Sequence, residues 1–309
     1  MMRLAFFLAV LTLAAGCVLE DKPIIPDDGG IEAGPCGVCA FETPVCNVDD
    51  LQCVECTAED DGFCAGKPLV CKTDTFECVE CIASSDCNDA DAARCDTDLN
   101  ECDACQGDGD CTGIAGLLRC GEGVCVECTP DTETDDCGGK SCDPATFACT
   151  ATVLASRETC QTCVSDSECK EAGNRCVAMT YQGAPYPDMQ TGFCLKTTEG
   201  GCERPFAITL ADRASLSGPP TASYCGINET LATCPAVKAL LDDVQCTGGM
   251  ASECPQPSGL CEQVGDLQNR CTYPCDVAQQ CLPIGNPDNP NPGSTCGSSG
   301  SGSDDYCGG

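Results

Sequence analysis

Cysteine is the residue type in this chain whose number and spacing could do chemistry. The sequence has 37 cysteines in 309 residues. A cysteine thiol can be acylated, can bind a metal as thiolate, or can be oxidised to a disulfide. Cys17 stands alone at the end of an apolar leader, whereas the others recur from Cys36 to Cys307. The two groups therefore predict two different kinds of chemistry.

The leader, residues 1–16, has the composition of a secretory signal peptide. Arg3 supplies a positive charge, and residues 4–15 form an apolar run. A membrane-spanning helix needs about 20 apolar residues, and acidic residues follow soon after Cys17, so we expect cleavage rather than a retained span. The sequence therefore predicts export.

The junction Ala14-Ala15-Gly16-Cys17 resembles the lipobox of bacterial lipoproteins. The resemblance implies that Cys17 is acylated with diacylglycerol and becomes the new N-terminus. The chain departs from the family at Ala14, where leucine is usual; here leucine lies one residue earlier, at Leu13. Small residues before the cut also suit ordinary signal peptidase, which leaves a freely secreted protein as the alternative. The expected location is the cell envelope, at the outer membrane or cell surface.

The later cysteines form tandem four-cysteine units. Cys-x-x-Cys pairs begin at Cys53, Cys78, Cys102 and Cys125, and in each pair the first cysteine closes one unit while the second opens the next. An even number of cysteines in each unit favours closed, local disulfides. The units consist of Cys36, Cys39, Cys46 and Cys53; Cys56, Cys64, Cys71 and Cys78; Cys81, Cys87, Cys95 and Cys102; Cys105, Cys111, Cys120 and Cys125; and Cys128, Cys137, Cys142 and Cys149.

Each unit ends in turn-forming residues between two short arms, which predicts small β-hairpins and loops with little regular structure. Cysteine at this density in an exported chain is typical of a disulfide scaffold. Four cysteines allow three pairings. Among them we favour first with third and second with fourth, which pairs Cys56 with Cys71 and Cys64 with Cys78.

An acidic residue often precedes the second cysteine of a unit, as in Asp86-Cys87 and Asp110-Cys111. With the Cys-x-x-Cys joints, this step resembles the tandem cysteine repeats of bacterial surface lipoproteins over residues 36–176. It is more loosely similar to Dickkopf N-terminal cysteine-rich and EGF-like modules. The resemblance implies small disulfide modules, and it identifies no contact residues for a receptor.

The cysteine spacing also has a metal interpretation. The pairs at Cys53 and Cys78 lie near the spacing of a Cys₄ zinc ribbon. Two extra cysteines inside every interval, together with the export signal, favour disulfides over zinc and over iron–sulfur ligation. A thioredoxin-like redox motif would need an α/β scaffold, which the repeat lacks. We therefore expect no metal and no cofactor.

One acidic segment copies the opening of a calcium-binding loop. Asp96, Asp98 and Asn100 have the alternate spacing of an EF-hand, but Glu101 stands at its glycine position and Gly107 at its closing glutamate. A loose calcium site is therefore only an alternative to a solvated loop. Its oxygen ligands would come from Asp108, Asp110, Asp135 and Asp136.

Composition excludes several classes of function. The formal net charge is −34, which repels phosphate backbones and makes nucleic acid a poor partner. Histidine is absent, so the usual general base and every Ser-His or Cys-His arrangement are missing. Aromatic residues are only 4% and tryptophan is absent, so we expect small cores. The sequence predicts a protein that is not an enzyme.

Several elements must position these cysteines. The break at 151–159, which runs from uncharged to mixed residues, is the best domain boundary, and Val237, Leu240, Leu241 and Val244 predict one short amphipathic helix near 235–245. The predicted organisation is a signal peptide at 1–16, a lipidated N-terminus and flexible acidic tether at 17–35, tandem four-cysteine repeats at 36–149, a further repeat with a long insertion at 150–202, and a diverged cysteine-rich C-terminal module at 203–309.

The insertion between Cys176 and Cys194 contains Tyr181 and Tyr186. A long loop with two tyrosines is a possible binding surface, and the alternative is that the pair covers a small core. The favoured function is a lipid-anchored, non-enzymatic cell-envelope protein with a surface, adhesion or structural role. Its partners would be the membrane, through the lipid, and an unidentified extracellular or envelope protein or glycan. A protease-inhibitor-like protein and a loose calcium-binding surface protein are the alternatives.

Overall fold

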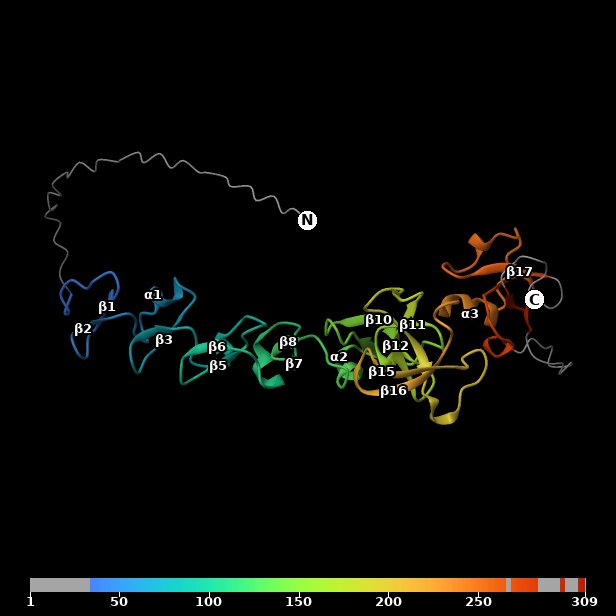
Figure 1. The fold of residues 1–309 in the computed structure, drawn as a ribbon. Coiled ribbons are helices and arrows are strands. Elements are labelled where there is room, and N and C mark those ends of the chain that lie inside the picture. The colour runs from blue at the N-terminus through green and yellow to red at the C-terminus, as the bar shows by residue number, and fades with distance from the viewer. Residues whose placement is uncertain (1–33, 265–267, 283–294, 298–304, 309) are drawn as a thin grey trace, which may run out of the picture.

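The computed structural model describes residues 34–264, 268–282, 295–297 and 305–308. Figure 1 shows an extended row of small modules at the blue end of the chain, followed by a larger domain in green to red. We call the row, residues 36–149, the rod, and the described residues from 150 onward the head. The prediction of small disulfide-rich modules in tandem is confirmed.

Each rod module contains one antiparallel hairpin of very short strands. Strands this short cannot bury a core of their own. The hairpins are β1 (Val45–Asn47) with β2 (Gln52–Val54), β3 (Val70–Lys72) with β4 (Glu77–Val79), β5 (Arg94–Asp96) with β6 (Glu101–Asp103), β7 (Arg119–Gly121) with β8 (Val124–Val126), and β9 (Lys140–Cys142) with β10 (Cys149–Val153). Short helices accompany four of them: α1 (Gly62–Ala65), η1 (Ser84–Asp86), η2 (Asp108–Gly113) and α2 (Glu133–Asp136).

Disulfides replace the missing core. The third and fourth cysteines of every rod module lie directly opposite each other in the hairpin, as Cys71 and Cys78 do in module 2. The first cysteine bonds the third and the second bonds the fourth, closing loops with sequence separations of 10 to 15. Each such link contributes about 3 kcal/mol by restricting the unfolded chain. Modules 1 to 5 are residues 36–53, 56–78, 81–102, 105–125 and 128–149.

The acid before the second cysteine closes a loop. Asp86 Oδ2 accepts hydrogen bonds from the backbone N–H groups of Ile82 and Ala83, at 2.9 and 3.0 Å. Asp110 Oδ2 accepts one from Gln106 N–H at 2.9 Å. Short side-chain acceptors commonly satisfy such exposed amides ahead of a helical turn. Part of the chain's acidity therefore stabilises its own loops.

A recurrent Val-Glu-Cys sequence has a similar structural explanation. The glutamate before the first cysteine of a module accepts the backbone N–H of the fourth cysteine, and so ties the start of the module to its end. The bonds join Glu55 to Cys78 at 2.8 Å, Glu80 to Cys102 at 3.1 Å, and Glu127 to Cys149 at 3.0 Å.

Hydrogen bonds also cross the joints between rod modules. They restrict the motion of one module relative to the next more than a two-residue linker alone would. From module 2 to module 5 the crossing bonds are Lys72 Nζ to Asn100 Oδ1 at 2.8 Å, Cys125 N–H to Ala90 C=O at 2.8 Å, and the Arg119 guanidinium to the Asp136 carboxylate at 2.7 and 2.8 Å.

The head contains longer strands around one hydrophobic core. Its four-stranded antiparallel sheet has the order β11 (Thr162–Cys163), β14 (Gly192–Lys196), β12 (Asn174–Tyr181), β13 (Ala184–Tyr186). Further elements are the hairpin β15 (Ile208–Ser215) and β16 (Gly218–Gly226), helix α3 (Cys234–Leu241), the hairpins β17 (Leu260–Val264) with β18 (Gln268–Thr272) and β19 (Cys296–Gly297) with β20 (Tyr306–Cys307), and the short helices η3 (Asp166–Glu168), η4 (Thr198–Gly200), η5 (Ala251–Glu253) and η6 (Ala278–Gln280).

The head core joins residues from the sheet, the β15–β16 hairpin and α3. Val177, Phe193, Leu195, Tyr224 and Val237 are each at most 1% exposed. In the rod, by contrast, the buried clusters consist mainly of cysteines. The head is therefore the part of the chain that can support a shaped surface.

The head also repeats the module three times. The pairing of first with third and second with fourth cysteine recurs, and the third and fourth cysteines again face each other on two paired antiparallel strands. Modules 6, 7 and 8 contain Cys163–Cys176 with Cys169–Cys194, Cys246–Cys261 with Cys254–Cys271, and Cys275–Cys296 with Cys281–Cys307. Of two further disulfides, Cys160–Cys234 joins the segment before module 6 to α3, and Cys202–Cys225 joins the segment after module 6 to β16.

Hydrogen bonds and a disulfide cross two of the predicted boundaries. In the break at 151–159, Leu154 N–H donates to Gly139 C=O and Ala155 N–H to Ser167 C=O. The division after residue 202 cuts through the core, because segments on both sides contribute to it and the Cys160–Cys234 disulfide spans them. Neither backbone hydrogen bonds nor burial between distant segments changes the local composition of the sequence. The sequence pattern therefore could not show that residues 151–159 bond to both sides, or that one core spans residue 202.

The predicted helix near 235–245 exists but ends earlier. Helix α3 stops at Leu241, and Asp243 has φ +56°, which ends the helical path before Val244. Val237 and Leu240 are buried as expected, whereas Leu241 and Val244 are 41% and 37% exposed. Within the described residues, no helix has the length and apolar character that crossing a membrane requires.

Candidate functional site

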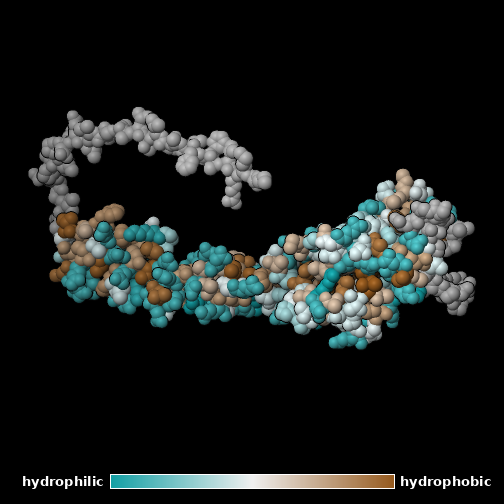
Figure 2. Space-filling model, in the orientation of Figure 1, coloured by the Kyte–Doolittle hydropathy of each residue, from teal (hydrophilic) through white to brown (hydrophobic). Residues whose placement is uncertain are grey.

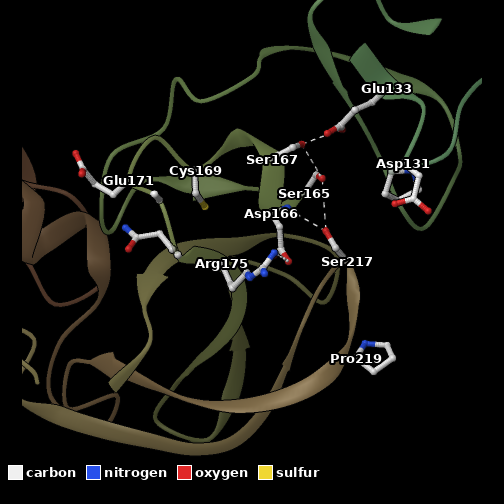
Figure 3. A pocket seen from close by; sticks show the side chains of 14 residues that line it. Asp131, Glu133, Ser165, Asp166, Ser167, Cys169, Glu171, Arg175, Ser217 and Pro219 are labelled. Carbon is white, nitrogen blue, oxygen red and sulfur yellow. Dashed lines mark hydrogen bonds and ion pairs between the residues drawn. The ribbon is translucent and has the colours of Figure 1, made fainter. Parts of the chain in front are cut away.

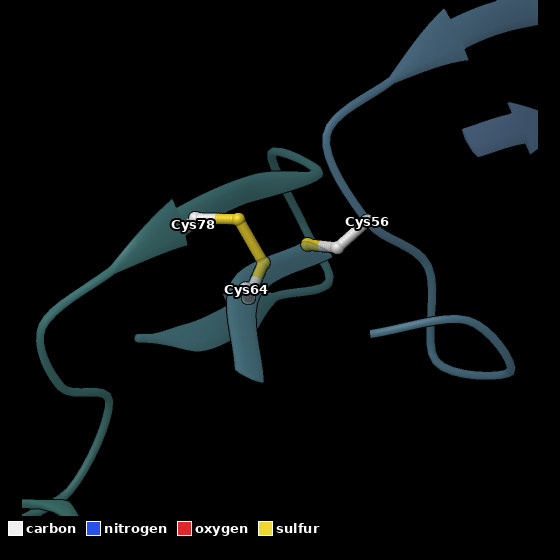
Figure 4. Close-up of side chains that lie close together, drawn as sticks. All are labelled: Cys56, Cys64 and Cys78. Atoms are coloured by element: carbon white, nitrogen blue, oxygen red, sulfur yellow. A yellow bond between two sulfur atoms is a disulfide. The ribbon is translucent and has the colours of Figure 1, made fainter. Parts of the chain in front are cut away.

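The predicted disulfide residues lie together as expected. Cys56 bonds Cys71 and Cys64 bonds Cys78, with S–S distances of 2.02 and 2.03 Å. Figure 4 shows the Cys64–Cys78 bond with the Cys56 sulfur beside it. This is the pairing that the sequence analysis favoured, and it recurs in all eight modules.

These sulfur clusters are as compact as a metal site. The sulfurs of Cys56, Cys64 and Cys78 lie within 4.8 Å of one another, and similar groups occur in other modules. A cysteine binds metal as a free thiolate. Since each of these sulfurs already belongs to a disulfide, the clusters are the small cores of the modules.

The acids proposed for a loose calcium site are largely engaged by the chain itself. Asp108 accepts the Cys120 N–H at 3.0 Å and Arg119 Nη1 at 2.9 Å, and these bonds lower the pKa of its carboxyl group. Asp136 accepts two bonds from the same guanidinium, and Asp110 caps its own loop. The calcium alternative thus receives no support from an open carboxylate cluster here.

Cys17 and most of the predicted tether lie outside the described residues. The first described module carries several exposed apolar side chains. Val38, Phe41, Val48 and Leu51 are 83%, 88%, 66% and 60% exposed, and Figure 2 shows brown surface at this end of the molecule. The rod therefore begins with an apolar surface on its first module.

The two tyrosines of the insertion do not lie on an irregular loop. They belong to β12 and β13, which pair Met179 with Tyr186 and Tyr181 with Ala184. Tyr186 stacks on the buried Phe193 ring with centroids 6.1 Å apart, and burial raises the pKa of its phenol. Tyr186 therefore covers the core, which was the alternative to a binding role.

Tyr181 has the more open position. Its ring contacts Tyr186 edge-on, with centroids 6.4 Å apart, and its hydroxyl accepts a bond from Gln182. Tyr181 lines a cleft of about 540 Å³ with Gln182, Thr230, Leu231, Pro274, Cys275, Asp276 and Asp305. Of the predicted pair, Tyr181 is therefore the residue placed to meet a ligand.

We expect the two tyrosines to respond differently to substitution. Tyr186→Ala removes a ring that packs on Phe193, so it should lower the free energy of unfolding of the head by about 2 kcal/mol. Tyr181→Ala should cost less than about 1 kcal/mol, because its ring contacts the core only through Tyr186. Chemical denaturation of both variants measures the difference, and equal losses would contradict this assignment.

A second cleft, of about 450 Å³, lies where the rod meets the head. Figure 3 shows Glu133 from the rod bonded to Ser167 of the head, with Ser165, Asp166 and Ser217 beside them. The Ser167 hydroxyl donates to Glu133 Oε2 at 2.8 Å, and Asp166 N–H donates to the Ser217 hydroxyl oxygen at 2.9 Å. The walls of this cleft are thus already bonded to each other.

Further hydrogen bonds of the junction cleft join its serine side chains and tie the rod to the head. The nearest partners of Ser165 in its hydrogen-bond network are the hydroxyls of Ser167 and Ser217, at 3.0 and 3.5 Å. A matching bond on the buried side joins the Ser141 hydroxyl of the rod to Glu168 Oε1 of the head at 2.6 Å. Together these bonds fix the rod to the head.

No protein-family model, curated protein or solved structure matches this chain.

Proposed function

We propose that this chain is a lipid-anchored, non-enzymatic protein of the cell envelope, in which the rod holds the head away from the membrane. Tandem disulfide-bonded modules fit an extracellular or surface role. The anchor would be the acylated Cys17, and several acyl chains bound to one residue would give nearly permanent attachment. The head would be the part that meets a partner.

The observation that carries this proposal is the bonding that runs from module 2 to module 5 and from the rod into the head. Hydrogen bonds cross the joints from module 2 to module 5, and the Ser167–Glu133 and Ser141–Glu168 bonds continue into the head. Glu133 and Glu168 are 7% and 1% exposed. Two buried carboxylates that accept hydrogen bonds across this joint restrict the motion of the head relative to the rod.

The charge of the chain supports the same role. A net charge of −34 repels anionic surfaces and other copies of the chain, which favours an extended, soluble rod. Absence of histidine from the whole sequence agrees with a display role. The non-enzymatic character is a prediction from that composition.

Cys17→Ser tests the anchor. The variant removes the thiol that the lipid would modify, so we expect the protein to move from the membrane fraction to the soluble fraction of its host. Cys36→Ser/Cys46→Ser is the control, since it removes the Cys36–Cys46 disulfide of module 1 but leaves Cys17 and the lipobox-like sequence intact. Unchanged membrane partition of Cys17→Ser would contradict the anchor.

A further inference from the structure

Cations are scarce in this chain, so their positions are informative. The sequence has 15 lysines and arginines against 49 acidic residues. Among the described residues, seven cations form ion pairs: Arg94, Arg119, Lys170, Arg175, Arg213, Lys238 and Arg270. Lys67 lies over the Phe63 ring, while Lys72 and Arg157 donate to neutral side chains.

Three described cations have no such side-chain partner: Lys140, Lys196 and Arg204. Two of the three line one cleft of about 220 Å³ in the head. Lys196 is the last residue of β14, and Arg204 precedes β15. The other lining residues are Thr159, Glu203, Phe206 and Cys225. Even with the Glu203 carboxylate counted, these two cations leave the cleft with a net positive charge, which is unusual in a chain this acidic.

The segment that carries Arg204 is held firmly. The Cys202–Cys225 disulfide fixes it two residues before Arg204. Pro205, the next residue, is fully buried, and Phe206 N–H donates to Glu203 C=O at 2.8 Å. A site whose backbone is fixed before binding loses less entropy when a ligand arrives.

Lys196 is held by the central sheet. Its backbone pairs with Asn174 of β12 in the central sheet. Its side chain folds against Gly200, where an added Cβ would lie 3.3 Å from Nζ. The ammonium group is thus kept close to the η4 turn.

We propose that this cleft binds the carboxylate of an acidic sugar, a uronate residue of an envelope or extracellular polysaccharide. Arg204 and Lys196 would donate charge-assisted hydrogen bonds to the carboxylate. The apolar face of the sugar ring would pack on Phe206. The volume is smaller than the roughly 300 Å³ at which pockets for drug-sized ligands begin, which suits a single ring.

The neutral groups of the cleft favour a sugar over an acidic peptide. Thr159 Oγ1 accepts a bond from Asn174 Nδ2 at 3.0 Å, which leaves its own O–H free to donate. The Glu203 carboxylate can accept from ring hydroxyls but would repel a second acidic side chain. A ligand with one carboxylate and several hydroxyls uses all of these groups.

The test is an isothermal calorimetric titration of the full-length oxidised protein with a galacturonate trisaccharide. We expect binding to the native protein and at least tenfold weaker binding to Lys196→Gln/Arg204→Gln, which corresponds to about 1.4 kcal/mol. Lys140→Gln removes the third unpaired cation, which lies in β9 of the rod, and should leave the affinity unchanged. A neutral galactose trisaccharide should bind at least tenfold more weakly than the uronate.

The proposal fails if the native protein does not bind the uronate, if the double variant binds it equally well, or if the neutral sugar binds as tightly. It also fails if a glutamate-rich peptide binds more tightly than the sugar in a Lys196- and Arg204-dependent way. The inference rests on the proposed function in treating the head as the part that meets ligands. Repeating the titration with Cys17→Ser distinguishes failure of the proposed anchor from failure of the proposed sugar site, because loss of the anchor should not change binding in solution.

Discussion

Replacing Cys160 and Cys234 together with serine should lower the free energy of unfolding of the head by about 4 kcal/mol. The disulfide between them has a sequence separation of 74, by far the largest loop closed in this chain. In the chain-entropy description, a link across a loop of that length removes about 4.5 kcal/mol of unfolded-state freedom. It also fixes the start of α3 beside the sheet, where both sulfurs are buried.

The natural control is Cys56→Ser/Cys71→Ser, which opens a loop with a separation of 15 in rod module 2. This double variant should lower the free energy of unfolding of module 2 by about 3 kcal/mol and leave the other modules unchanged. All five tyrosines, Tyr181, Tyr186, Tyr224, Tyr273 and Tyr306, lie in the head, and tryptophan is absent. Tyrosine fluorescence during chemical denaturation therefore reports the head alone. We expect its transition to shift for the head variant only; equal shifts would contradict independent unfolding of rod and head.

The local disulfides could be predicted from sequence because their determinants are local. Within a module the third and fourth cysteines flank a short turn, so a hairpin brings them opposite each other, as Cys71 and Cys78 show. The first and second cysteines lie 14 or 15 residues from their partners in module 2. Spacing, turn residues and export context all favour one compact unit, and the structure has it.

The contacts between residues far apart in the sequence could not be predicted from the cysteine spacing. Cys160 looks like the first half of a Cys-x-x-Cys joint, yet its partner is on α3 because the head sheet packs against that helix. The tyrosines of the insertion were expected on a loop, but the segment continues the sheet and buries one ring on Phe193. Lys196 and Arg204 line the same cleft, and the position of Arg204 there depends on the Cys202–Cys225 disulfide. The cysteine spacing did not specify that Cys202 bonds Cys225.

Glu229 should make the head sensitive to acid. Its carboxylate accepts two bonds from the Arg213 guanidinium, at 2.8 and 2.9 Å, and bonds from the Thr180 hydroxyl and N–H at 2.7 and 3.1 Å. Burial alone would raise the pKa of this group, but the hydrogen bonds from Arg213 and Thr180 outweigh it and hold the pKa below its ordinary value of 4.5.

A lowered pKa in the folded protein means that the folded state favours the charged carboxylate. The stability that this group contributes is therefore fully present above about pH 4.5 and is lost as the pH falls through the pKa of the folded state. Glu229→Gln keeps the shape but removes the charge beside Arg213, whose side chain is only 29% exposed. We expect a loss of about 2 kcal/mol at pH 7, less than the 3 to 5 kcal/mol typical of a fully buried pair.

The decisive measurement is the pH dependence of that loss. The stability difference between native protein and Glu229→Gln should shrink as the pH is lowered from 6 to 3, because protonation removes the same charge from the native protein. Glu199→Gln is a suitable control, since Glu199 is exposed on the η4 turn and should show no such convergence. If the two head variants behave alike over this range, the Glu229 carboxylate is not the group that links folding of the head to pH.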